Sequence, residues 1–136
     1  MSLKFLLPSV AALAASLALL ACGSDSKGSE EQEQTSPAVA LKEAGETRAA
    51  LTAALATYKG GDQRAAEDQV AEAYLQHFEE VEGALEEKDA ELMEKLEEAI
   101  NGDLRNAMKE GKPAGEVEAQ VNAVVADLRK AEAALQ

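Results

Sequence analysis

The sequence predicts an all-α protein, and three observations lead to this prediction. Ala, Leu, Glu, Lys, Gln and Arg, which have strong intrinsic helix propensity, dominate the chain. Apolar residues recur at spacings of three and four, the repeat of one helix face. Aromatic residues make up only 3% of the chain and Trp is absent, which disfavours a β-sandwich. We therefore expect an antiparallel up-down four-helix bundle formed by residues 37–136.

The N-terminal segment predicts export from the cytoplasm. Lys4 supplies a positive charge, and the run from Phe5 to Ala21 is apolar apart from one Pro and two Ser, as in a secretory signal peptide. Leu19-Leu20-Ala21-Cys22 looks like a bacterial lipobox, in which the cysteine thiol is acylated and the peptide is cut before it. An uncleaved anchor is the alternative, but 17 residues only just reach the length that spans a bilayer. We expect residues 1–21 to be a removed signal peptide.

Cys22 is the only cysteine, so an intrachain disulfide is impossible and lipidation gives the thiol a role. Anchoring would then come from the acyl chains. Gly23, directly after the acylated cysteine, favours the outer membrane, with the protein facing the periplasm. The predicted localisation is therefore lipid-anchored to the bacterial cell envelope.

Charge restricts the class of partner. Removing the signal leaves 115 residues with 12 basic and 26 acidic side chains, a net charge of −14. Nucleic acid and anionic lipid head groups would repel such a surface, so neither is an expected partner. The acidic surface suits cations, basic partners or simple solubility. Residues 22–36 contain no large apolar side chain and predict a flexible acidic linker between lipid and domain.

Helix boundary signals divide the rest of the chain. Ser36 can cap a first helix that begins at Pro37 and stops at Gly60-Gly61. Asp62 can cap a second helix that ends at Lys88. The apolar stripe of the first helix is Leu41, Ala44, Leu51, Leu55 and Tyr58, and that of the second is Val70, Tyr74, Phe78, Val81 and Leu85.

Two further helices follow. Asp89 opens the third, which closes at Gly111, and Pro113 marks the turn into the fourth. The third stripe is Leu92, Leu96, Ile100, Leu104 and Ala107, flanked by Met93 and Met108, and the fourth is Val117, Val121, Val124, Leu128, Ala131 and Leu135. A long two-helix hairpin that dimerises would also bury these stripes, but the glycine breaks favour the bundle.

Arg48 occupies a position on the apolar stripe of the first helix. An arginine there either extends its charged end into solvent or pairs with a carboxylate from a facing helix. Asp103 lies on the same side of its helix as Leu92 and Leu96, so we predict a structural pair between Arg48 and Asp103.

Carboxylates near the only histidine are the candidate metal ligands. His77, Glu79 and Glu82 lie together on the second helix, and Glu97 could face them from the third. A full dinuclear bundle site needs a second histidine, which the chain lacks. Carboxylates alone suit a hard ion such as ferric iron or calcium. The alternative is a solvated acidic face bordering the core.

Other chemistry has no support in the sequence. A bundle haem needs facing axial ligands, and neither Cys-x-x-Cys-His nor a glycine-rich phosphate loop occurs. Lipidation would leave no free cysteine nucleophile. We therefore expect no enzyme activity.

Several stretches resemble a known family. Tyr58-Lys59-Gly60-Gly61-Asp62, the run from Ala73 to Glu82, and the segments 104–108, 111–113 and 116–135 look like the extracytoplasmic N-terminal helical domain of some bacterial high-affinity iron permeases. The similarity covers roughly residues 55–136, and its diagnostic residues are Tyr74, Phe78, Glu79 and Glu82. A weaker similarity links the chain to imelysin-related periplasmic iron-uptake proteins.

The resemblance implies a freestanding, lipid-anchored accessory protein for uptake of iron or another metal cation. It would act by carboxylate binding, with iron as its ligand, or by docking to an iron permease or its accessory proteins. The chain lacks the permease's membrane helices and its Arg-Glu-x-x-Glu motif, so it is not the transporter itself. The alternative is a structural envelope lipoprotein whose helices form a protein-interaction module without metal.

Overall fold

The computed structural model describes residues 35–136, which belong to one compact unit. The predicted signal peptide, the lipidation site at Cys22 and nearly all of the linker lie outside the described residues. Helices account for almost all of residues 35–136, and no strand occurs there, so the all-α prediction is confirmed. None of the helices in this part of the chain combines the length and apolar character that crossing a membrane requires.

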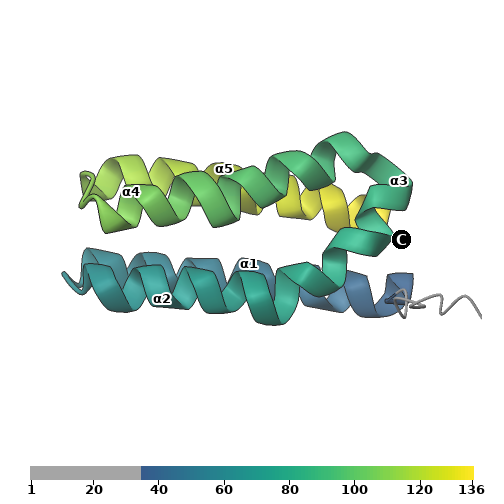
Figure 1. Ribbon diagram of the computed structural model, residues 1–136, viewed down its shortest axis with the longest axis horizontal. Helices are drawn as coiled ribbons and strands as arrows, with labels where there is room; N and C mark the ends of the chain where they lie inside the picture. The colour runs from purple at the N-terminus through teal and green to yellow at the C-terminus, as the bar shows by residue number, and fades with distance from the viewer. Residues whose placement is uncertain (1–34) are drawn as a thin grey trace, which may run out of the picture. The chain divides into compact units, whose positions relative to one another are not determined.

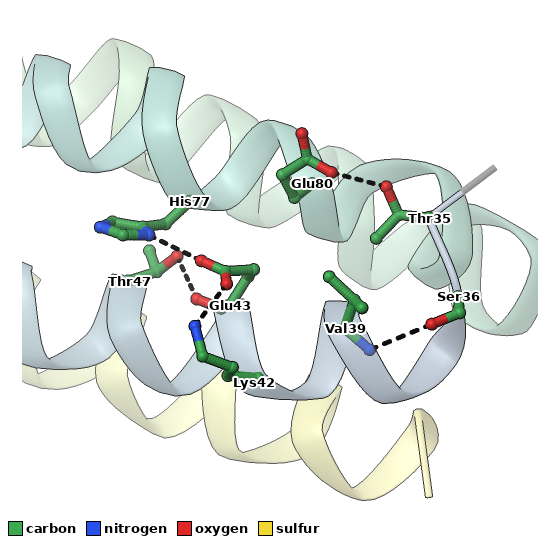
Figure 2. Close-up of polar contacts among 8 residues, drawn as sticks. All are labelled: Thr35, Ser36, Val39, Lys42, Glu43, Thr47, His77 and Glu80. Carbon is green, nitrogen blue, oxygen red and sulfur yellow. Dashed lines mark hydrogen bonds and ion pairs between the residues drawn. The ribbon is translucent and has the colours of Figure 1, made fainter. Parts of the chain in front are cut away.

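α1 spans Pro37–Lys59 and begins as predicted. The Ser36 hydroxyl accepts a hydrogen bond from the Val39 amide at 3.4 Å (Figure 2), and Pro37 occupies the first turn, where its missing N–H costs nothing. Gly60 ends the helix, and Gly61 follows with a φ of 96°, a left-handed conformation that glycine adopts without steric cost. The chain therefore reverses directly after α1.

The next helical run consists of α2 (Gln63–Ala73), the π-helical turn η1 (Tyr74–Phe78) and α3 (Glu79–Glu97). Asp62 caps α2 by accepting from the Ala65 amide at 3.0 Å, as predicted. The π-helical turn is new relative to the sequence prediction. In it the Glu79 amide donates to the Tyr74 carbonyl five residues earlier, which shifts the register of the helix faces.

The predicted break at Lys88 and Asp89 falls inside α3. Asp89 has the non-helical angles φ −156° and ψ 81°, and its carboxylate accepts from the Leu92 amide at 3.0 Å. The chain changes direction here and returns through a second π-helical segment, η2 (Glu98–Leu104), into α4 (Arg105–Lys109) (Figure 1). One helical element therefore contains the end of the predicted second helix and the start of the third.

α5 spans Ala114–Ala134 and follows a turn in which Gly111 has a φ of 70°. It packs against α1 and α3, while α1 also packs against α2 and α3, and α2 against α4. In Figure 1 the α1 and α2 ribbons lie together, with α4 and α5 running alongside them. The helices therefore surround a shared interior.

The interior is formed by the predicted stripes. Every residue named for the second and fourth stripes is buried, and Leu51, Leu96, Ile100, Leu104 and Met108 are fully buried. Leu41, Leu92 and Met93 are partly buried against this core. Removing a large apolar side chain such as Phe78 from such a core costs about 3–5 kcal/mol. The core prediction is confirmed at nearly every position.

Polar contacts set the register between helices. The Tyr58 hydroxyl at the end of α1 donates to the Lys112 carbonyl at 2.6 Å, joining α1 to the turn before α5. Arg105 of α4 donates from Nε (2.9 Å) and Nη2 (2.7 Å) to Oε1 of Glu67 on α2. These bonds connect elements that are far apart in the sequence.

Candidate functional site

Carboxylates gather around Tyr74 where η1 meets α3. We call Tyr74, Glu79, Glu82 and Glu97 the acidic group. Tyr74 is buried and its ring packs on Phe78 with centroids 5.8 Å apart, while Glu82 and Glu97 are half-buried and Glu79 is exposed. Because α3 changes direction at Asp89, Glu97 near its end comes close enough to Glu82 to repel its charge. Three of the four predicted metal ligands are therefore neighbours.

Glu82 has the least favourable environment in the acidic group. Its Oε1 is buried and has no hydrogen-bond partner among the described residues. Burial, followed by repulsion from Glu97, Glu79 and Glu86, raises the pKa of the Glu82 carboxyl, and the hydrogen bond with Tyr74 opposes this rise only in part. An unpartnered carboxylate oxygen near other negative charges destabilises the fold unless a proton or cation joins it.

Tyr74 shares this environment. Burial raises the pKa of its phenol well above the usual range, and the hydrogen bond to Glu82 and the charges of Glu82, Glu97 and Glu79 add to the rise. The phenol therefore stays protonated at neutral pH in the metal-free protein. It places a neutral oxygen at the inner edge of the acidic group.

The Glu97 side chain is also accessible from solvent. It lines an open hollow of about 380 Å³ with Glu94, Glu98, Asn101 and Gly102, at the start of η2. Of the acidic group, Glu97 alone lines this hollow. Among the residues that the structure describes, however, no three His, Cys, Asp or Glu side chains are arranged to hold a metal ion between them.

His77, the fourth predicted ligand, contacts a different helix. Its Nδ1 lies 2.7 Å from Oε2 of Glu43 on α1, and Oε1 of Glu43 lies 2.7 Å from Nζ of Lys42 (Figure 2). Thr47, one turn further along α1, donates to the Glu43 carbonyl at 2.8 Å. The structure thus pairs His77 with Glu43.

The predicted partner of Arg48 is wrong. Nε of Arg48 lies 3.1 Å from Oε1 of Glu132 on α5, whereas Asp103 is exposed and forms no ion pair within residues 35–136. Asp103 lies in η2, whose π-helical register differs from that of the regular helix expected there. Because α1 and α5 are neighbours, the arginine is satisfied across that interface.

Two polar positions were absent from the sequence prediction. Glu43 sits outside the apolar stripe of α1 and gives no signal without knowledge of its neighbour. Asp127 is 7% exposed and binds both Lys95 and Lys130. The sequence signal for Asp127 was its position directly before Leu128, beside an otherwise apolar stripe.

The chain matches no protein-family model, no curated protein and no solved structure.

Proposed function

We propose that this chain is a lipid-anchored protein of the bacterial envelope that assists uptake of iron or another hard metal cation, and that the acidic group is where the cation binds. The observation that supports this function is the state of Glu82, whose buried Oε1 lacks a partner while neighbouring carboxylates raise its pKa. A cation at that point would relieve both penalties.

The ligand chemistry favours a hard ion. The acidic group offers carboxylate oxygens and one phenol oxygen, with neither sulfur nor imidazole, and such oxygen donors suit Ca²⁺, Mg²⁺ or ferric iron. Glu79 is exposed and Glu97 borders an open hollow, so both side chains have room to move toward Glu82. Binding would therefore draw the carboxylates together around an ion.

The proposed localisation in the cell envelope rests on the sequence. Acylation of Cys22 would hold residues 35–136 near the membrane, where an accessory protein could pass cations to a permease or dock to its partners. The resemblance of residues 55–136 to the extracytoplasmic domain of iron permeases points to the same process. A role of this kind requires no catalytic step.

The bundle itself is part of this proposal. We take Asp89, with its non-helical backbone and its cap on Leu92, as the turn between a second and a third helix of an up-down four-helix bundle. The acidic group would then bridge those two helices, with Glu79 and Glu82 before the turn and Glu97 after it.

A second candidate is a helical protein-interaction module without metal. It is favoured by the lack of any three-residue metal-ligand arrangement within residues 35–136. Leu75 also favours the interaction module, because this apolar side chain in η1 is 60% exposed.

The deciding experiment is calorimetric titration of the full-length chain in non-ionic detergent with ferric citrate, Ca²⁺ and Mg²⁺. A Glu79→Gln/Glu82→Gln variant removes two carboxylates of the acidic group. An Asp103→Asn/Glu116→Gln variant removes the same charge from exposed positions. Saturable binding that the first variant loses and the second retains is expected. Equal binding by all three proteins would assign the cation to the general negative charge and favour the interaction module.

The lipid anchor is tested separately. Mass spectrometry of the protein from bacterial membranes should show an acylated N-terminal Cys22, and Cys22→Ser should release the chain from the membrane fraction. An unmodified thiol in membrane-bound protein would refute the anchor.

A further inference from the structure

A second hollow, on the surface between α1 and the run from α2 into η1, gathers a different set of donors. It has a volume of about 260 Å³. Ala50 and Ala53 of α1 line one side. The remaining lining residues are Gln69, Glu72, Ala73, Gln76 and His77. The hollow shares no residue with the acidic group.

The contact between His77 and Glu43 orients the imidazole. A carboxylate oxygen accepts hydrogen bonds, and Oε1 of Glu43 already accepts from Nζ of Lys42. Nδ1 of His77 must therefore donate the proton at the 2.7 Å contact. In the tautomer with its proton on Nδ1, the lone pair lies on Nε2, the ring nitrogen on the side away from Glu43 in Figure 2. Histidines that bind metals commonly have this carboxylate partner on the other nitrogen.

Glu72 supplies carboxylate oxygens to the same hollow, and Gln69 also lines it. Nε2 of Gln76 donates to Oε1 of Glu72 at 2.9 Å, which orients the carboxylate and leaves its Oε2 for another partner. Oε1 of Gln69 is buried and has no hydrogen-bond partner among the described residues. A buried acceptor without a donor is unfavourable, and a cation would satisfy it.

Glu72 lies near the end of α2, and His77 lies in the π-helical turn that follows it. On a regular α-helix, positions five apart differ by about 140° around the axis, because each turn takes 3.6 residues. A π-helical turn bonds residues five apart and so brings such positions toward one face. His77 lies inside η1. The local backbone therefore favours a histidine and carboxylate on the same side.

We propose that this hollow binds one divalent transition-metal ion, Cu²⁺ or Zn²⁺, through Nε2 of His77 and the carboxylate of Glu72, with the Gln69 amide oxygen and water as further ligands. Imidazole with oxygen donors suits these ions, and Cu²⁺ binds most tightly in the divalent series. Glu43 positions the imidazole without touching the metal. The site is independent of the hard-cation function proposed above.

The test uses Cu²⁺ as the probe and the full-length chain in non-ionic detergent. All samples carry Cys22→Ser, so that no thiol competes for copper. Calorimetry gives the stoichiometry and affinity, and electron paramagnetic resonance detects nitrogen coordinated to Cu²⁺. His77→Gln and Glu72→Gln each remove a proposed ligand, whereas Glu82→Gln removes a carboxylate of the acidic group as the matched control.

We expect one saturable Cu²⁺ site with an imidazole nitrogen signal. The affinity should fall at least tenfold in His77→Gln and in Glu72→Gln, and it should be unchanged in Glu82→Gln. Glu72 is exposed, so Glu72→Gln keeps the fold and decides the question even if His77→Gln is unstable by circular dichroism. Equal affinity in the parent chain and in Glu72→Gln, or bound Cu²⁺ without an imidazole signal, would overturn the site.

Discussion

Asp127 of α5 binds Lys95 of α3, with carboxylate Oδ2 2.7 Å from ammonium Nζ. Its other oxygen, Oδ1, lies 2.6 Å from Nζ of Lys130, three residues further along α5. The Asp127 side chain is 10% exposed, whereas the two lysines are 61% and 66% exposed. The nearly buried carboxylate of Asp127 therefore pairs with two solvent-exposed lysines. One of them, Lys95, connects α5 to the part of α3 beyond Asp89.

We expect Asp127→Asn to lower the free energy of unfolding by about 1–2 kcal/mol at neutral pH, as for loss of charged hydrogen bonds with solvated donors. Hydrogen bonds from Lys130 and then Lys95 lower the pKa of Asp127 from its ordinary value of 3.8. A lowered pKa means that the folded state binds this proton less readily than the unfolded state. The stabilisation is therefore present above pH 3.8 and is lost as the pH falls through the folded pKa.

Urea unfolding of both proteins between acidic and neutral pH checks this. The two stabilities should converge at the acid end. Asp103→Asn is the matched control, because Asp103 is exposed and forms no ion pair within the described residues. A difference between parent and Asp127→Asn that persists unchanged into acid would contradict an electrostatic origin.

We expect Glu82→Gln to change the free energy of unfolding in the opposite direction from Asp127→Asn. Burial, then repulsion from Glu97, Glu79 and Glu86, raises the Glu82 pKa above its ordinary value of 4.5. The folded state therefore holds this proton more tightly, and the parent protein loses stability as the pH rises from 4.5 through the folded pKa. We expect Glu82→Gln to stabilise the metal-free protein at neutral pH by on the order of 0.5 kcal/mol, since solvent screens a half-buried group.

Thermal unfolding with a chelator present measures this gain. Glu116→Gln removes an equal charge at an exposed position and should change the melting temperature little. A lower melting temperature for Glu82→Gln at neutral pH would show that the carboxylate stabilises the fold, contrary to the rise in its pKa.

Helix faces were predictable because burial follows the repeat of the helix. The stripe from Val70 to Leu85 was identified correctly, and so was the stripe from Val117 to Leu135, where each residue is buried. The cap signals at Ser36 and Asp62 were also sufficient, since capping depends on residues only three apart. Local chemistry accounts for these successes.

Long-range partners were not predictable in the same way. The choice of Glu132 for Arg48 depends on the packing of α1 against α5, and many carboxylates on other helices were equally suitable by sequence. The π-helical turns have no composition of their own, because inserting one residue into a helix leaves propensities unchanged. In the structure, His77 of η1 meets Glu43, while Glu79, Glu82 and Glu97 lie near Tyr74.

A double-mutant cycle should distinguish the two partners considered for Arg48. Arg48→Ala with Glu132→Ala should give a coupling energy of about 0.2–1 kcal/mol, the range for partly exposed pairs. Arg48→Ala with Asp103→Ala should give additive losses. Denaturant unfolding of the five variants and the parent supplies both cycles. Coupling to Asp103 and additivity with Glu132 would reverse the assignment.

Gly111 is expected to be the less replaceable of the two left-handed glycines. Alanine at φ 70° or, for Gly61, at φ 96° costs about 1–2 kcal/mol in backbone strain. Only at Gly111 would a new Cβ also collide with a neighbour, the Nε2 end of Gln63, whereas nothing lies near Gly61. Gly111→Ala should therefore lose more stability than Gly61→Ala. Adding Gln63→Ala should bring the loss at Gly111 down to that at Gly61, measured by urea unfolding. An equal loss at both glycines with Gln63 intact would mean that this exposed side chain moves aside freely.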